Sequence, residues 1–514
     1  MTGSDPVLYR ITERRRQVEL SSCVAEVLAM NLISLTFAVF FIIVLATYHL
    51  VKSPDHKYLV IAAAACIFYG WGSPLRVVLL FVATTIIYIG GLLLERAKNP
   101  KQKRIVYIVS FALTVSILIG YKILNYRGIS LPVGLSFYIF QAVTYLHDVD
   151  HGKLSAEHNF MRLFAFVSFF PSVLSGPIQK ARYLLPQLRN PKDPDTEQLI
   201  HGFLLFVWGM FVKACVADRL SGAVAYVFDA AGYYNGLYHL TAAMLFAIEL
   251  YADFSAYSDM AIGTAAMLGF SVERNFDNPF LSVNLKELWN RWHVSLNDWF
   301  IENVYFPLGG SRMGTARKYA NIMVVFLISG LWHGQGLHFV IWGIVNGVLL
   351  VIGELTDGFR KSIRGKFHIR EDAEWLLWLR RLIVFLLFSL AFIFFRAGTV
   401  EAALVMLKGI FTIRPWMFSG FYPQQMFEKD NTLFLTALFA ILFFLFIQYE
   451  RRGKTVREEN GFKKQVLISK AYQKFRSTPV VLQMCGLAVL LALAVFAVCS
   501  GDTATNTQFI YFAF

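Results

Sequence analysis

The sequence predicts an all-α, polytopic membrane protein, and three observations favour that class. Hydrophobic residues make up 56% of the 514 residues and charged residues only 16%, whereas a soluble domain carries about 25% charged residues. Long apolar runs recur along the chain, and the basic residues behind its net charge of +14 gather in short loops between these runs. This placement is typical of cytoplasmic loops facing anionic membrane lipids, so we expect no nucleic-acid partner.

The apolar runs predict about 11–14 transmembrane or re-entrant helices, because a span takes about 20 mostly apolar residues. The clearest runs are 32–51, 57–71, 75–94, 105–121, 199–216, 319–331, 337–353, 382–395, 433–449 and 480–499. Four others, 131–146, 160–174, 240–251 and 254–270, are short or interrupted. Broken helices are tolerated at membrane depth where they are buried in protein or line a cavity. We therefore expect some of these segments to be re-entrant or tilted.

We expect residues 30–514 to form a single membrane domain, with residues 501–514 as an aromatic C-terminal tail. Basic loops at 95–104, 360–381 and 450–476 are predicted to be cytoplasmic. This places the tail outside the cell after the last span.

The first 29 residues conflict with that orientation. Counting back from loop 95–104 puts the start of the first span outside, yet the basic segment 10–16 prefers the inside. Either one early segment does not cross, or residues 1–29 are an N-terminal extension from a misassigned start. Met30 leads directly into the first span, which favours the second explanation.

The five cysteines are scattered, and the sequence has no CxxC or Cys/His spacing typical of a metal site. Neither a disulfide framework nor a zinc site is predicted. We expect no bound metal or cofactor.

His333 is the first candidate for chemistry, within Leu331-Trp332-His333-Gly334. An ionisable side chain at bilayer depth is costly, so its default interpretation is functional. The alternative is a core histidine that is hydrogen-bonded between helices. A neutral imidazole with a pKa of about 6.5 can take a proton from a hydroxyl. We interpret His333 as a catalytic base, with Trp332 lining its site.

His293 is the second candidate, in Arg291-Trp292-His293. Residues 286–300 have the pattern of one amphipathic helix whose tryptophans lie at the membrane interface. A solvated helix face with aromatic anchors is the alternative. His293 is catalytic only if this helix lines the cavity that holds His333, and Arg291 and Trp292 would then support the site.

Asp253 and Asp259 lie among aromatic and small residues. They could orient a histidine or line a polar channel, or merely cap a broken helix. Both interpretations stay open.

The chain ends in Phe509-Ile510-Tyr511-Phe512-Ala513-Phe514. Such a tail is commonly an aromatic interface anchor. The alternative is that it folds back and offers the Tyr511 phenol as a nucleophile beside a base.

At these residues the chain resembles the membrane-bound O-acyltransferase family, in particular a bacterial branch that includes alginate O-acetylation and teichoic-acid D-alanylation proteins. The matching segments are 132–138, 176–178, 253–259, 291–299, 306–310, 331–334 and 509–514. They follow the family's order from about Met30 to Phe514. Asn290 departs from the pattern, because relatives often carry a basic residue there.

The resemblance implies that His333 is the catalytic histidine and His293 the second site histidine, beside a funnel from the cytoplasmic face. It implies an acyl thioester donor, either acetyl-CoA or a carrier-protein thioester. The acceptor would be a cell-surface polysaccharide, often reached through a separate extracellular acyltransferase. It also implies that Tyr511 can carry the acyl group as a relay ester.

Three other functions stay open at this point. One is D-alanyl transfer to teichoic acid from a carrier-protein thioester. Another is a transporter or flippase of a lipid-linked or acylated saccharide, in which the histidines relay protons. A third is a structural scaffold, in which both histidines tolerate alanine. Paired repeats typical of transporters are not evident in the sequence.

Overall fold

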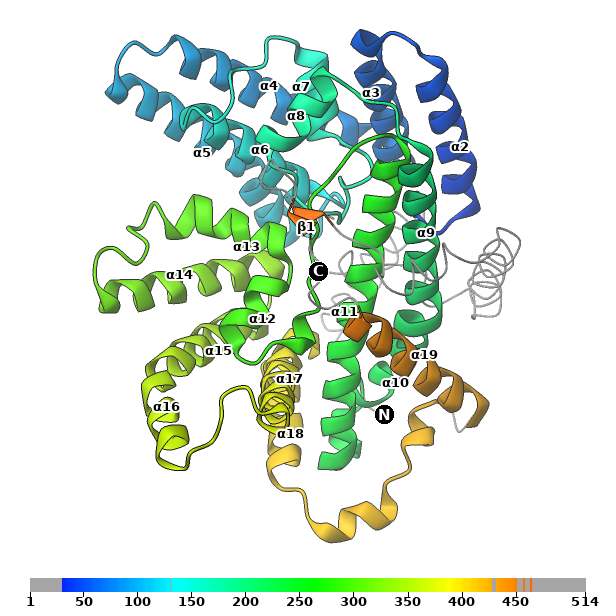
Figure 1. The fold of residues 1–514 in the computed structure, drawn as a ribbon, viewed down its shortest axis with the longest axis vertical. Coiled ribbons are helices and arrows are strands. Elements are labelled where there is room, and N and C mark those ends of the chain that lie inside the picture. The colour runs from blue at the N-terminus through cyan, green and yellow to red at the C-terminus, as the bar shows by residue number, and fades with distance from the viewer. Residues whose placement is uncertain (1–29, 130, 428–430, 451–455, 458–462, 465–514) are drawn as a thin grey trace, which may run out of the picture. The chain divides into compact units, whose positions relative to one another are not determined.

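A computed structural model describes residues 30–129, 131–427, 431–450, 456–457 and 463–464 (Figure 1). The described chain is α-helical apart from two short antiparallel strands, β1 (Val456–Arg457) and β2 (Lys463–Lys464). It divides into two compact units. Unit 1 comprises residues up to Leu199 together with Ala265–Val272, and unit 2 comprises Ile200–Thr264 together with the residues from Glu273 on. The all-α prediction is confirmed.

Unit 1 is a bundle of helices around aromatic side chains. Its helices are α2 (Leu35–Leu50), α3 (Pro54–Gly70), α4 (Leu75–Arg96), α5 (Pro100–Asn125), α6 (Leu135–Asp150), α7 (Phe160–Val167) and α8 (Ala181–Arg189). Helix α4 packs against α5 and α6. At Gly91 an added Cβ would lie 2.3 Å from Tyr145 Oη, so glycine lets α4 and α6 approach closely.

Unit 2 holds most of the remaining elements. They are α9 (Thr196–Val212), a π-helical turn η1 (Lys213–Ala217), α10 (Asp218–Phe228), η2 (Ala231–Tyr233), α11 (Gly236–Met267), η3 (Pro279–Leu281), α12 (Leu285–Arg291), α13 (Val294–Phe300), η4 (Ile301–Tyr305), α14 (Thr315–His333), α15 (Leu337–Leu355), α16 (Asp357–Lys366), α17 (Glu374–Arg396), α18 (Val400–Phe411), η5 (Pro415–Gly420), η6 (Pro423–Phe427) and α19 (Asn431–Glu450). A few terminal residues of α9 and α11 belong to unit 1.

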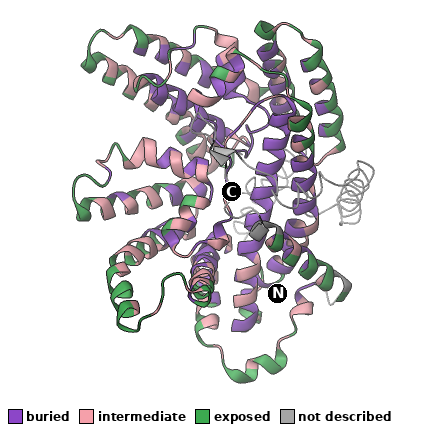
Figure 2. Ribbon diagram, in the orientation of Figure 1, coloured by how far each residue is buried: buried purple, intermediate pink, exposed green. Residues whose placement is uncertain are grey.

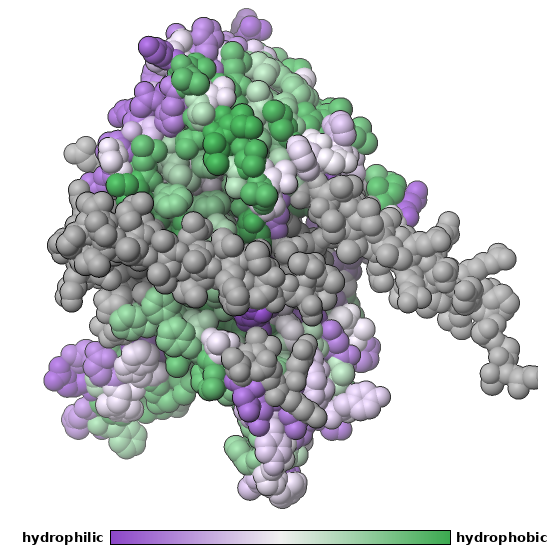
Figure 3. Space-filling view, turned by 90° about the vertical axis from the view of Figure 1, so that its right-hand side faces the viewer, coloured by the Kyte–Doolittle hydropathy of each residue, from purple (hydrophilic) through white to green (hydrophobic). Residues whose placement is uncertain are grey.

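Several described helices are long and apolar enough to cross a bilayer. They are Leu75–Arg96, Pro100–Asn125, Thr196–Phe228, Leu337–Leu355 and Glu374–Arg396. Figure 3 shows patches of hydrophobic side chains on the surface that it draws in colour. The protein is therefore a multi-pass membrane protein, as the sequence predicts. The predicted span at 480–499 lies outside the described residues.

Two sequence expectations are wrong at the level of single helices. The segments 240–251 and 254–270 are not separate, because α11 runs unbroken through both. Figure 2 shows α11 buried along most of its length, so its polar side chains lie inside the protein rather than at a helix break. Conversely, the predicted single helix 286–300 is broken into α12 and α13 at His293, whose φ is +43°.

Helices α14 and α15 form a hairpin that glycines hold close together (Figure 1). A Cβ on Gly330 would lie 2.5 Å from the Phe339 carbonyl oxygen. A Cβ on Gly343 would lie 2.3 Å from the Phe326 carbonyl oxygen. Small residues at such positions let membrane helices pack backbone to backbone. The hairpin therefore fixes the end of α14, where His333 lies.

Gly343→Ala is expected to force α14 and α15 apart, because the new methyl meets backbone rather than a movable side chain. Overpacking of this kind costs about 1–3 kcal/mol. Gly353→Ala on the same helix is the matched control, since a Cβ there meets nothing within 4 Å. Thermal unfolding in nanodiscs should show a lower midpoint for Gly343→Ala only. Equal midpoints for the two variants would contradict close packing at Gly343.

Candidate functional site

His333 is the last residue of α14, where Gly334 turns the chain into extended backbone. Its side chain is buried. The imidazole centroid lies 4.9 Å from the Trp342 ring of α15 and 5.0 Å from the Phe395 ring of α17, both edge to face. The adjacent Trp332 ring is 4.6 Å away. The base candidate therefore lies in an aromatic surrounding contributed by three helices.

His293 lies between α12 and α13 and is also buried. Its Nδ1 is 3.2 Å from Asn275 Oδ1, and its ring packs edge to face on Phe254 of α11 at 4.6 Å. Left-handed backbone is uncommon for residues other than glycine, although histidine is enriched there. Such conformations cluster at functional sites.

An aromatic cluster connects the surroundings of the two histidines. It consists of Trp289, Trp292, Trp342, Phe388 and Phe392. Phe392 lies 5.4 Å from Trp342, which touches His333, and 5.9 Å from Trp292, which precedes His293. Trp289 of α12 also packs on Trp342 at 6.1 Å. Within unit 2 the cluster thus contacts the His333 ring through Trp342 and reaches Trp292, the residue that precedes His293.

The cluster also corrects the expectation that these tryptophans are interface anchors. Trp292 is 4% exposed and Trp299 is 5% exposed. They pack inside the protein, next to two short helices that the turn at His293 separates. Trp292 belongs to the cluster, and Trp299 packs on Phe300.

The other predicted site residues have different settings. Trp332 is half-buried beside His333. Arg291 pairs with Glu287 on its own helix, with Nη2 and Oε1 2.6 Å apart. Asp259 is buried in α11. Tyr511 lies outside the described residues.

Asp253 belongs to a buried ion-pair cluster that sequence reasoning missed. Lys213 Nζ lies 2.7 Å from Asp253 Oδ1 and 2.7 Å from Asp218 Oδ1. Lys213 is 1% exposed and Asp253 is fully buried. A lysine inside the apolar run 199–216 meets the same criterion that identified His333, so the signal was present in the sequence.

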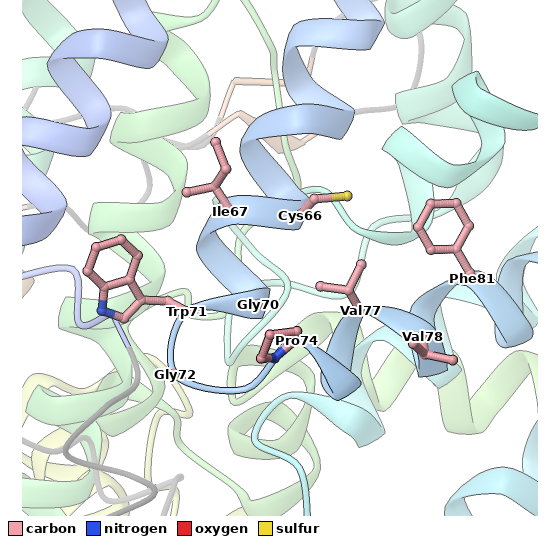
Figure 4. A pocket seen from close by; sticks show the side chains of 9 residues that line it. All are labelled: Cys66, Ile67, Gly70, Trp71, Gly72, Pro74, Val77, Val78 and Phe81. Atoms are coloured by element: carbon pink, nitrogen blue, oxygen red, sulfur yellow. The ribbon is translucent and has the colours of Figure 1, made fainter.

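No site for a metal ion is found in the part of the chain that the structure describes, since no three His, Cys, Asp or Glu side chains are suitably grouped there. A cavity of about 680 Å³ lies in unit 1 where α3 meets α4 (Figure 4). Its walls are mostly apolar, and Cys66, Trp71, Val77 and Phe81 are among the residues that line it. It offers no acid–base pair, so the histidines of unit 2 remain the candidate site.

The sequence matches a known protein family over more than half of its length. The family model described as membrane-bound O-acyltransferase matches residues 109–397. The chain belongs to this family. The matched region contains both site histidines, so the resemblance drawn from the motifs is confirmed.

The relatives bear names consistent with this family. A protein of Pseudomonas fluorescens named "Probable alginate O-acetylase AlgI" is 32% identical over 78% of this chain and 79% of its own. A Helicobacter pylori protein named peptidoglycan O-acetyltransferase is 29% identical over 70% of this chain and 74% of its own. A Bacillus subtilis protein named teichoic acid D-alanyltransferase is 26% identical over 45% of this chain and 61% of its own. The protein is therefore a membrane O-acyltransferase.

The protonation of His293 gives this acyltransferase a predicted pH dependence of stability. Burial lowers the pKa of His293 to about 3, whereas an unfolded histidine has a pKa of about 6.5. As the pH falls, the unfolded state binds a proton at this histidine before the folded state does. The contribution of His293 to the free energy of unfolding is therefore complete above pH 6.5 and is lost toward pH 3. Between pH 7 and pH 5 the loss is about 2 kcal/mol.

Thermal unfolding in nanodiscs at pH 7 and pH 5 tests this expectation. The midpoint of the wild type should fall more on acidification than that of His293→Gln, which has no proton to gain at this position. Identical pH shifts in the two proteins would contradict a neutral, buried His293.

Proposed function

We propose that this O-acyltransferase moves an acetyl group from a cytoplasmic thioester across the membrane to hydroxyls of a cell-surface polysaccharide. The observation that carries the proposal is the buried His333 in an aromatic surrounding that it shares with the turn holding His293. The names of the relatives support acetyl, because the two O-acetylating relatives have higher identities and coverages than the D-alanyl one.

In the proposed reaction His333 acts as general base. Its neutral imidazole takes the proton of the attacking hydroxyl while the hydroxyl oxygen bonds to the thioester carbonyl carbon. Collapse of the tetrahedral intermediate breaks the carbon–sulfur bond, and the departing thiolate takes the proton from the imidazolium. Buried aromatic walls limit water, which would otherwise hydrolyse the thioester.

The attacking hydroxyl is either that of the final acceptor or the phenol of Tyr511. In the second case a tyrosyl ester forms first, and a hydroxyl outside the cell then attacks that ester. A separate extracellular acyltransferase is the expected partner for this last step. Basic loops at the cytoplasmic mouth would meet the phosphates of the donor.

The donor is tested with purified protein in nanodiscs and radiolabelled acetyl-CoA, followed by thioester consumption and protein-bound label. A carrier-protein D-alanyl thioester is assayed in parallel. We expect consumption of acetyl-CoA and label on the wild-type protein that Tyr511→Phe lacks. Consumption without protein-bound label would favour direct transfer. Turnover of the D-alanyl thioester alone would overturn the acetyl assignment.

A further inference from the structure

Asn275 places a buried amide between three polar side chains. Its Oδ1 lies 3.2 Å from His293 Nδ1 and 2.6 Å from Ser295 Oγ. Its Nδ2 donates to Ser258 Oγ at 3.0 Å. All four residues are buried, and Asn275 is fully so. An amide oxygen only accepts hydrogen bonds, so both the His293 ring and the Ser295 hydroxyl must donate to it.

The backbone holds the two segments in register. The Val294 N–H donates to the Asn275 carbonyl at 2.8 Å, and the Asp277 N–H donates to the Arg291 carbonyl at 3.0 Å. These bonds fix the turn at His293, whose left-handed backbone persists only where its surroundings enforce it. Ser258 of α11 anchors the amide from the other side. Asn275 therefore holds one edge of the His293 ring, while Phe254 packs against the ring edge to face.

We propose that Asn275 is a positioning residue that fixes His293 as the tautomer with its proton on Nδ1 and its lone pair on Nε2. The inference rests on the proposed function, in which His293 belongs to the site. The hydrogen bond that one imidazole nitrogen makes determines whether the other nitrogen carries a proton. A neutral ring held in this way accepts a hydrogen bond at Nε2 and cannot donate one there.

This tautomer narrows the role of His293. Oxyanion stabilisation requires a hydrogen-bond donor, which Nε2 does not provide in this state. His293 instead orients a substrate group that carries an N–H or O–H, such as an amide of the donor's thioester arm or the hydroxyl of the acceptor. His333 remains the group that takes the proton in the chemical step.

The tautomer is measured directly, whether or not the protein turns over. Solid-state ¹⁵N NMR of histidine-labelled protein in lipid, compared with His293→Gln to assign the signal, should show a protonated Nδ1 and an unprotonated Nε2 at pH 7.5. In Asn275→Leu the signal should move to the opposite tautomer or to a mixture. A protonated Nε2 in the wild type would overturn the proposal.

Kinetics with labelled acetyl-CoA provide the functional arm. Asn275→Leu removes the acceptor at nearly constant size, and we expect kcat/KM to fall by about 10–100-fold through misorientation of the ring. Asn275→Asp keeps acceptor oxygens and should retain most activity at pH 8, where the imidazolium is disfavoured. Asn321→Ala is the matched control, because it removes a buried amide that binds the Leu308 and Gly310 carbonyls instead.

A double-mutant comparison separates positioning from general structural damage. In a His293→Ala background, Asn275→Leu should change kcat/KM by no more than about threefold, since its partner is gone. Equal losses in Asn275→Asp and Asn275→Leu, or full additivity with His293→Ala, would overturn the inference. Normal turnover of His293→Ala would overturn it too, while leaving acyl transfer through His333 intact. Inactivity of the wild type with every thioester would instead refute the proposed function, and the NMR result would still decide the tautomer.

Discussion

Replacement of His333 by alanine is expected to abolish acyl transfer while the protein stays folded. General-base catalysis contributes about 10²–10⁴-fold to a rate, and His333, buried at the end of α14, is the proposed base. The truncation leaves a cavity between Trp342 and Phe395. The measurement is kcat/KM with labelled acetyl-CoA, together with the thermal midpoint of the same preparation.

His239→Ala is the matched control for burial of a histidine in unit 2. His239 is 2% exposed, and its Nε2 is satisfied by the Ala231 carbonyl at 2.9 Å. We expect this variant to lose stability and to keep its turnover per folded molecule. Retained acyl transfer in His333→Ala would exclude His333 as the base.

Lys213→Met is expected to have the largest effect on stability. It removes the cation that faces the fully buried Asp253. Breaking a buried ion pair by deleting one partner costs about 3–5 kcal/mol, because the other charge is left uncompensated. Denaturation in detergent, followed by helical circular dichroism, should show a midpoint far below that of the wild type.

The double variant Lys213→Met/Asp253→Leu is the control for this effect. Replacing both members of a buried pair by apolar groups is often neutral, and the remaining Asp218 side chain is 23% exposed and can be hydrated. The double variant should therefore recover much of the lost stability. If it is less stable than Lys213→Met alone, the cost does not come from an uncompensated charge at Asp253.

The sequence predicts the helical spans well because each depends on local composition. The runs 75–94, 337–353 and 382–395 lie within α4, α15 and α17. His333 was identified from the cost of a polar group in an apolar run, and the structure places it in a buried aromatic surrounding. Both predictions use information contained in a short stretch of chain.

The failures have long-range causes. No glycine or proline marks the helix break at His293 in the sequence. Asn275, which contacts the His293 ring, lies eighteen residues earlier in the chain. Helix α11 continues through Asp253, whose carboxylate pairs with Lys213, forty residues earlier in the chain. Local pattern cannot supply these partners, because they become neighbours only after the helices pack.

The most direct test of the central claim is a sided acetyl-transfer assay in proteoliposomes. Labelled acetyl-CoA is supplied on the face that carries the 95–104 loop, and label is followed on polysaccharide hydroxyls on the opposite face, with the proposed extracellular acyltransferase added. The account predicts labelled acceptor with the wild type and none with His333→Ala. Transfer that persists in His333→Ala, or label that never crosses from the donor side, would contradict it.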